Sequence, residues 1–168
     1  MKAAVLWTGG KDCALAMQKA MDLGYTVVKL ITFVPKNPEF KAHPLEIINK
    51  QVELINISHE YIVINEPYTE SYECSIQKLV NEGIQCLVTG DIDFVSGNPN
   101  WIDERCRKID VKVFKPLWNL SRVNILQDLL AREFDVVFSA VKTDVFDQTW
   151  IGRHITAATI ADLNILSS

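Results

Sequence analysis

The chain has 168 residues, of which 48% are hydrophobic and 23% are charged, a composition typical of one globular domain over residues 1–168. Its 17 lysines and arginines against 21 aspartates and glutamates give a net charge of −4. This charge disfavours nucleic acid as a partner, because domains that bind phosphate backbones usually carry a basic face. No apolar run approaches the roughly 18 residues of a membrane span, and Ala3–Trp7 is too short for a signal-peptide core. The sequence therefore predicts a cytoplasmic protein with no membrane partner.

Short β-branched runs alternate with longer helical patterns, which is typical of βαβ units and a mostly parallel sheet. In chain order we expect strands at Ala3–Trp7, Val27–Phe33, Tyr61–Ile64, Cys86–Thr89, Val111–Phe114 and Val136–Val141. The helices expected between them are Lys11–Leu23, Leu45–Ile55, Tyr72–Asn81, Trp101–Lys108 and Val123–Phe134, the last with Ser121 as its N-cap. This alternation predicts a doubly wound, Rossmann-like α/β fold with a mostly parallel sheet of five or six strands and helices on both faces.

Four cysteines are widely spaced along the chain, at positions 13, 74, 86 and 106. The absence of any C-x-x-C pair argues against a zinc site and against a disulfide framework. We therefore expect these thiols to be small core residues.

The first strand is followed by Thr8-Gly9-Gly10-Lys11-Asp12-Cys13, at the start of the first helix. Adjacent glycines let the backbone approach a ligand closely, and the first-turn N–H groups favour an anion. Thr8 adds a hydroxyl donor, and Lys11 adds a charge able to reach a phosphate. The spacing is neither that of a Walker loop, which needs Ser or Thr after the lysine, nor that of G-x-G-x-x-G. A plain glycine turn with a solvated Lys11 and Asp12 is the alternative.

In a doubly wound sheet, ligands bind beyond the carboxyl ends of the strands. The loops after the first, second and fourth strands are therefore the ones expected to carry chemistry. The fourth strand ends at Gly90-Asp91, which places a carboxylate at this edge. A loop carboxylate without a functional role is the alternative for Asp91.

The first loop resembles the PP-loop of the N-type ATP pyrophosphatases, whose pattern is Ser-Gly-Gly-x-Asp-Ser directly after the first strand. Thr8 keeps the first hydroxyl, whereas Cys13 replaces the second with a weaker donor. Further segments resemble the diphthine–ammonia ligase-like branch of this adenine nucleotide alpha hydrolase-like superfamily. They are His43-Pro44, Thr89-Gly90-Asp91-Ile92, Glu104-Arg105-Cys106, Pro116-Leu117-Trp118 and Trp150-Ile151-Gly152-Arg153. Members of that branch continue beyond the last of these segments, and we expect the continuation to contribute to the acceptor site.

The resemblance implies cleavage of ATP between its α and β phosphates, with AMP transferred to a substrate oxygen. The residues that would hold the phosphates are Thr8, Gly9, Gly10, Lys11, Asp12 and Cys13, with Gly90 at the neighbouring strand end. The end of the second strand, Ile31, Thr32 and Phe33, would supply backbone contacts and an apolar wall to adenine.

The resemblance also implies a Mg²⁺ ion that bridges the phosphates, for which Asp12 and Asp91 are the candidate ligands. Lys11 and Asp91 are the candidate catalytic residues, Asp91 either as a metal ligand or as the group that orients ammonia. The alternative for Asp12 is a carboxylate that stabilises the helix dipole.

Two residues outside these loops are candidates for substrate contacts. His43 would lie near the nucleotide, with a structural or solvated histidine as the alternative. Arg153 would bind a carboxylate or phosphate through two parallel hydrogen bonds, with a surface ion pair as the alternative.

These residues together predict an ATP-dependent ligase that makes an acyl-adenylate and passes the acyl group to ammonia. By resemblance, the acceptor is diphthine on the protein partner elongation factor 2. The exposed edges of an open sheet predict a homodimer. Two alternatives are a nucleotide-binding sensor without turnover, and a PP-loop thiolase or lysidine-type ligase with a different acceptor. The latter would carry a basic RNA-binding domain and paired cysteines, which this sequence lacks.

Overall fold

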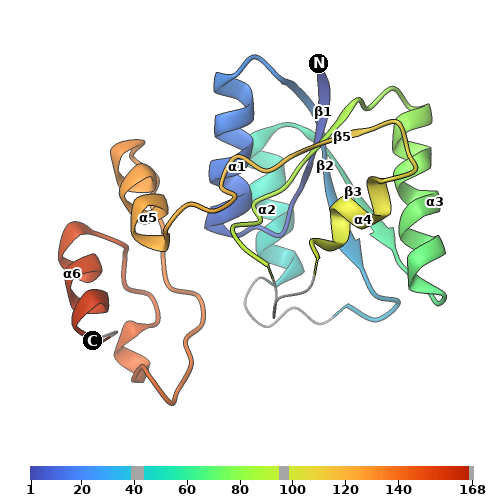
Figure 1. The fold of residues 1–168 in the computed structure, drawn as a ribbon. Coiled ribbons are helices and arrows are strands. Elements are labelled where there is room, and N and C mark those ends of the chain that lie inside the picture. The colour runs from blue at the N-terminus through green and yellow to red at the C-terminus, as the bar shows by residue number, and fades with distance from the viewer. Residues whose placement is uncertain (39–43, 95–98, 167–168) are drawn as a thin grey trace.

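The computed structural model describes residues 1–38, 44–94 and 99–166, so that His43 lies outside the described residues. Within them the chain forms one sheet of five parallel strands (Figure 1). The strands are β1 (Lys2–Leu6), β2 (Thr26–Val34), β3 (Ser58–Val63), β4 (Cys86–Val88) and β5 (Lys112–Phe114). The helices are α1 (Lys11–Asp22), α2 (Leu45–Ile55), α3 (Tyr68–Asn81), α4 (Trp101–Cys106), α5 (Arg122–Ala131), the 3₁₀ turn η1 (Gln148–Trp150) and α6 (Ala157–Leu166).

The strand order β3-β2-β1-β4-β5 confirms the doubly wound, Rossmann-like α/β fold. From β1 the chain builds outward through β2 and β3, then returns to the other side of β1 for β4 and β5. The order therefore reverses between β1 and β4, which are direct neighbours. The loops that leave the carboxyl ends of these two strands lie side by side at this switch point, the usual place for a ligand in such a sheet.

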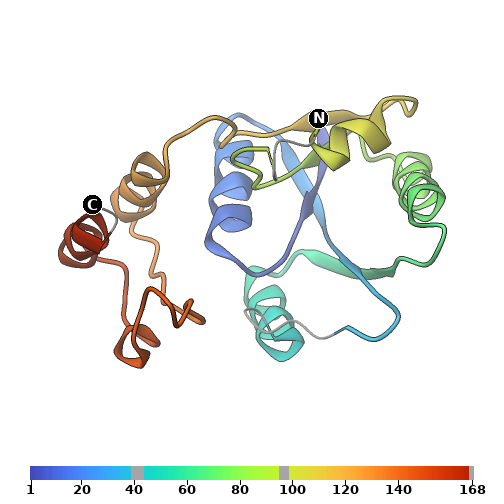
Figure 2. The ribbon, with the colours of Figure 1, turned by 60° about the horizontal axis from the view of Figure 1, so that its bottom comes forward.

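The sheet is covered on both faces (Figure 2). Alternate residues of each strand point to opposite faces, so Ala3 and Val5 of β1 pack with α1, α2 and α5, whereas Ala4 packs with α3 and α4. Three of the cysteines, Cys13, Cys86 and Cys106, are buried in these two layers as expected. The fourth, Cys74, is exposed, because its position on α3 points away from the sheet.

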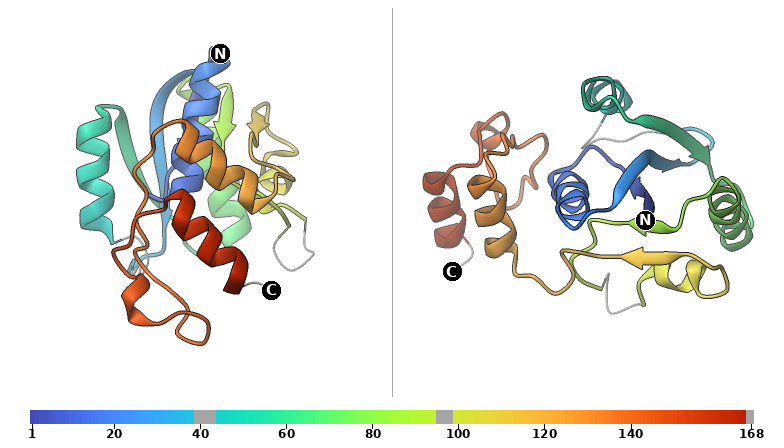
Figure 3. Two further views of the ribbon diagram at one scale, coloured as in Figure 1. Left: turned by 90° about the vertical axis from the view of Figure 1, so that its left-hand side faces the viewer. Right: turned by 90° about the horizontal axis from the view of Figure 1, so that it is seen from above.

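A sixth strand at Val136–Val141 is not formed, and that part of the prediction is wrong. The segment pairs instead with residues 152–155, through an antiparallel bridge between Val137 and His154. The Phe138 N–H donates to Arg153 O at 3.0 Å, and the Ile155 N–H donates to Val136 O at 2.7 Å. An apolar run does not reveal its partner strand, and here α5 carries the chain outward past α1 before the run begins (Figure 3).

Several helix and strand ends differ from their expected positions. The helix expected from Tyr72 begins at Tyr68, because Pro67 takes the N-cap position in an extended conformation. The helix expected to reach Phe134 ends at Ala131, since Glu133 is left-handed with φ of 59°. No helix in the described part of the chain is long and apolar enough to cross a bilayer.

Helix α5 should unfold together with the rest of the hydrophobic core. Its Leu129 is fully buried in the same cluster of side chains as residues of α1. Replacing Leu129 with Ala is expected to lower the free energy of unfolding by about 2–5 kcal/mol. Leu54→Ala, at a side chain that is 87% exposed, should change it by less than about 0.5 kcal/mol. Urea unfolding of both variants measures this, and equal effects would show that α5 is not part of the core.

Candidate functional site

The loop after β1 is anchored to β2 before it reaches α1. The Trp7 N–H donates to Ile31 O at 2.7 Å, and the buried Thr32 hydroxyl donates to Trp7 O at 2.6 Å. Gly10 is the N-cap of α1, with φ of −87° and ψ of 163°, and no described side chain caps the helix. The first-turn N–H groups of α1 therefore begin at the switch point without a competing side-chain acceptor, as an anion site requires.

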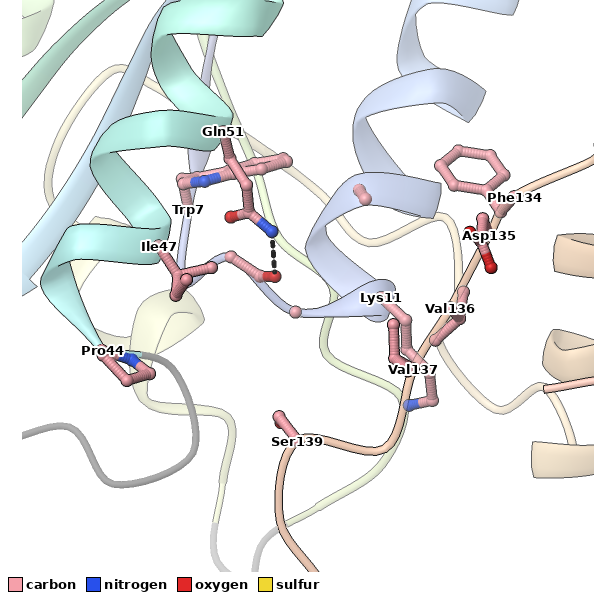
Figure 4. Close-up of a pocket in the computed structure, with 13 residues that line it drawn as sticks. Trp7, Lys11, Pro44, Ile47, Gln51, Phe134, Asp135, Val136, Val137 and Ser139 are labelled. Carbon is pink, nitrogen blue, oxygen red and sulfur yellow. Dashed lines mark hydrogen bonds between the residues drawn. The ribbon is translucent and has the colours of Figure 1, made fainter. Parts of the chain in front are cut away.

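Helix α2 determines the shape of the loop at Gly9. Gly9 has φ of 75°, and a Cβ there would lie 2.6 Å from Gln51 Oε1 and 3.1 Å from Ile48 Cγ1. The Gln51 side-chain amide donates from Nε2 to Gly9 O at 3.0 Å (Figure 4). The positive φ is the stronger reason for glycine here, because the end of the Gln51 side chain could shift to make room. The sequence pattern did not single out Gln51, although it lies three residues after the buried Ile48 and therefore on the same side of α2.

The end of β4 touches the first turn of α1 at Gly90. A Cβ on Gly90 would lie 2.6 Å from the carbonyl carbon of Asp12 and 2.7 Å from the amide nitrogen of Cys13. Both neighbours are backbone atoms that cannot move away alone. The lack of a side chain at Gly90 therefore allows the two loops of the switch point to meet.

Asp91 follows Gly90 and is held by two neighbours. Its N–H donates to the buried Thr89 hydroxyl oxygen at 3.3 Å, and its carboxylate accepts from Asn100 Nδ2 at 2.8 Å. Asn100 was missed by the sequence analysis. The available signal was the position of Asn100 directly before a helical pattern, which is typical of an N-cap.

Lys11 and Asp12 form an ion pair at the mouth of the site. Lys11 Nζ lies 2.8 Å from Asp12 Oδ2 and 2.9 Å from Oδ1. Each side chain is about one-third exposed, and such pairs contribute at most about 1 kcal/mol. Either partner can therefore be exchanged for a phosphate or a cation at little cost.

A cavity of about 330 Å³ opens beside this pair, between the loop, α2 and the segment after α5 (Figure 4). Its volume is within the usual range of about 300–1,000 Å³ for ligand sites. It is lined by Trp7, Gly9, Gly10, Lys11, Ala14, Pro44, Ile47, Gln51, Phe134, Asp135, Val136, Val137 and Ser139. The wall formed by residues 134–137 and Ser139 was missed because Val136–Val141 was expected to be a strand of the sheet. Lys11 also lines two further cavities, of about 270 and 150 Å³.

The thiol of Cys13 points inward. Its Sγ donates to Gly10 O at 3.0 Å and lies 3.8 Å from the Thr8 hydroxyl, which donates to it. Burial raises the pKa of this thiol, so that it stays protonated near neutral pH. Any contact of Cys13 with an anion therefore falls to its backbone N–H.

The end of β2 reaches the same edge of the sheet. The last paired residues of β1 and β2 are Leu6 and Ile31, so Phe33 extends beyond β1. The Thr32 oxygen lies 2.8 Å from His59 Nε2. Because the Thr32 hydroxyl donates to Trp7 O, the hydrogen between Thr32 and His59 must sit on Nε2. Burial lowers the pKa of His59 and favours its neutral imidazole.

The structure thus brings Thr8–Cys13 together with Gly90 and Asp91. It places Arg153 elsewhere, with Nη2 2.8 Å from Asp162 of α6 and the guanidinium over the Trp150 ring. In residues 1–38, 44–94 and 99–166 no three His, Cys, Asp or Glu side chains are grouped as metal ligands. A Mg²⁺ ion here would rest on one or two carboxylates, with phosphate oxygens and water completing its shell. The residues that would hold it are Asp12, now paired with Lys11, and Asp91, now hydrogen-bonded to Asn100.

The Gly90 contact can be tested by substitution. Gly90→Ala should lower the free energy of unfolding by about 1–3 kcal/mol and should abolish pyrophosphate binding, because the first turn of α1 must shift. Gly83→Ala is the control, since Gly83 has φ of 93° and open space around it. This substitution should lower the free energy of unfolding by about 1–2 kcal/mol and leave pyrophosphate binding unchanged. Calorimetric titration measures the binding, and wild-type affinity in Gly90→Ala would contradict the assignment.

Comparison with known proteins agrees with this geometry. No curated protein sequence matches the chain. A solved structure described as a predicted subunit of tRNA methyltransferase from Methanocaldococcus jannaschii has a similar fold, with a TM-score of 0.55 and 19% identity over 81% of this chain and 76% of that one. The family model of the diphthamide synthase N-terminal domain matches residues 1–113. The chain therefore belongs to the diphthamide synthase N-terminal domain family, within the PP-loop superfamily.

Proposed function

We propose that the protein is an ATP-dependent ligase that adenylates a carboxylate and converts it to an amide with ammonia. Its family indicates an enzyme of the PP-loop ATP pyrophosphatase kind. The observation that supports the proposal most strongly is the uncapped first turn of α1, held against the end of β4 at Gly90. This arrangement offers backbone N–H groups and a lysine to a polyphosphate, and two carboxylates that would contact it only through a bound cation.

The proposed reaction has two steps. A carboxylate oxygen of the acceptor attacks the α-phosphorus of ATP, the bond from that phosphorus to the bridging oxygen breaks, and pyrophosphate leaves with the electron pair. The nitrogen of ammonia then attacks the acyl carbon, the bond to the AMP oxygen breaks, and AMP leaves. The nitrogen loses one proton to solvent, which gives the amide.

The first step places growing negative charge on pyrophosphate. In this proposal the N–H groups of Gly9, Gly10 and Asp12 and the ammonium of Lys11 would stabilise that charge, and one such preorganised donor contributes about 3 kcal/mol to the transition state. In this step Lys11 leaves its weak ion pair with Asp12 and binds the phosphate oxygens instead. Mg²⁺ bound to Asp12 and Asp91 would add further positive charge at the phosphates.

The proposed contacts to adenine and to the acceptor are those that the resemblance to the diphthine–ammonia ligase-like branch implies. Adenine lies against the end of β2 at Ile31–Phe33, where Phe33 extends beyond the paired part of β1. The acceptor is diphthine of elongation factor 2, with His43 and Arg153 as its contacts. Binding of Arg153 to an acceptor requires the guanidinium to leave Asp162, to which it is paired.

A sensor that binds ATP without turnover is the second candidate. It is favoured by the inward thiol of Cys13, which donates its hydrogen bond to Gly10 O and leaves one fewer side-chain donor for the phosphates. Substitution of Lys11 separates the two candidates, because an enzyme loses rate whereas a sensor loses affinity only.

The purified protein with Mg²⁺, ammonium and acceptor should convert ATP to AMP and pyrophosphate, measured by ³¹P NMR. Lys11→Ala is expected to lower kcat about 100-fold, the typical loss when one transition-state donor is removed, with a smaller change in nucleotide affinity. Lys50→Ala, at an exposed position on α2, should leave both unchanged. Formation of ADP and phosphate would reject the mechanism, and nucleotide binding without any turnover would favour the sensor.

A further inference from the structure

Asn100 connects helix α4 to the switch point. It is the N-cap of α4, with φ of −64° and ψ of 120°, and its Oδ1 accepts from the Asp103 N–H at 3.3 Å. Its Nδ2 donates to Asp91 Oδ2 at 2.8 Å. The residue is only 8% exposed. Both ends of the buried amide therefore have a partner.

The chemistry of the two partners determines the orientation of this amide. A carboxylate only accepts hydrogen bonds when ionised, and a backbone N–H only donates, so Nδ2 must face Asp91 and Oδ1 must face Asp103. Ser, Thr, Asp and Asn are all good N-caps. Aspartate would set a second carboxylate against Asp91, and serine or threonine has a hydroxyl that is one bond shorter and carries no amide donor. Asparagine alone both caps the helix and reaches the carboxylate.

Helix capping by itself does not need this second contact. Ser121 caps α5 through an equivalent bond, its Oγ accepting from the Asn124 N–H at 3.1 Å, and it is exposed at the surface. Asn100, by contrast, is buried beside a loop that Gly90 already presses against α1. Asp91 is thus fixed from both sides, by Thr89 at its backbone and by Asn100 at its carboxylate.

We propose that Asn100 is a positioning residue that holds the Asp91 carboxylate in the orientation needed to bind a divalent cation at the phosphates of ATP. The inference rests on the proposed function, in which Asp91 is a metal ligand. Partners that orient a metal-binding carboxylate typically change metal affinity or activity 10- to 100-fold when they are lost. The effect of Asn100 on cation binding should be separable from its effect on helix capping. Nδ2 contacts Asp91, whereas Oδ1 caps α4 at the Asp103 N–H.

The test is a double-mutant cycle of Asn100→Ser and Asp91→Asn, with Ser121→Ala as the control for a lost N-cap. Mn²⁺ serves as the probe, and its affinity in the presence of a non-hydrolysable ATP analogue is measured by electron paramagnetic resonance. Asn100→Ser keeps a helix cap, so its midpoint of thermal unfolding should stay near that of the wild type. Its Mn²⁺ affinity should fall about 10- to 100-fold, but less than about twofold when Asp91 is already asparagine. Ser121→Ala should leave Mn²⁺ affinity unchanged.

Equal losses of Mn²⁺ affinity in both backgrounds, or wild-type affinity in Asn100→Ser, would overturn the inference and leave Asn100 as a helix cap only. The readout does not depend on turnover. If the wild type binds Mn²⁺ and the analogue but makes no AMP, the ligase proposal fails while the cycle still decides the role of Asn100. Where the wild type is active, kcat/KM for AMP formation should follow the same pattern of coupling.

Discussion

The close approach of the chain after β4 to the first turn of α1 is the contact on which the candidate site depends. Because Gly90 has no side chain, its backbone fits against Asp12 and Cys13, and the two loops of the switch point become a single surface. The parallel pairing of β1 with β4 brings these loops to the same edge. Gly9 makes the equivalent adjustment toward α2. Two glycines and the strand order therefore bring together the backbone of the loops that carry Lys11, Asp12 and Asp91.

The sequence predicted the parts of the fold that depend on local pattern. The alternation of strands and helices and the glycine pair after the first strand were enough for the doubly wound sheet and for the first loop. The strand at Val136–Val141 was wrong, because an apolar run contains no information about its partner, and here the partner is the chain around His154. The left-handed turn at Glu133 that ends α5 early likewise has no glycine to mark it.

The same limit applies to the site. Thr8, Lys11 and Asp91 could be proposed from the sequence because their residue types suit a phosphate or a metal and because they follow strand ends. Gln51 and Asn100 act through hydrogen bonds to residues distant in the sequence, at Gly9 and Asp91 respectively. A glutamine on an amphipathic helix and an asparagine before a helix have common structural uses. Only the contacts that Gln51 and Asn100 make in the folded chain show that they act at the candidate site.

The cavity beside Lys11 has one wall that the chain completes late. Residues 134–137 and Ser139 line it, yet this stretch is held in place by backbone bonds with residues 152–155 rather than by the sheet. During synthesis the five strands can assemble before that stretch has emerged, so the part of the cavity formed by the loop after β1 and by α2 can form first, open on one side. This wall also lies beyond residue 113, where the family match ends. Its side chains can therefore diverge while the part of the cavity within residues 1–113 keeps the family pattern.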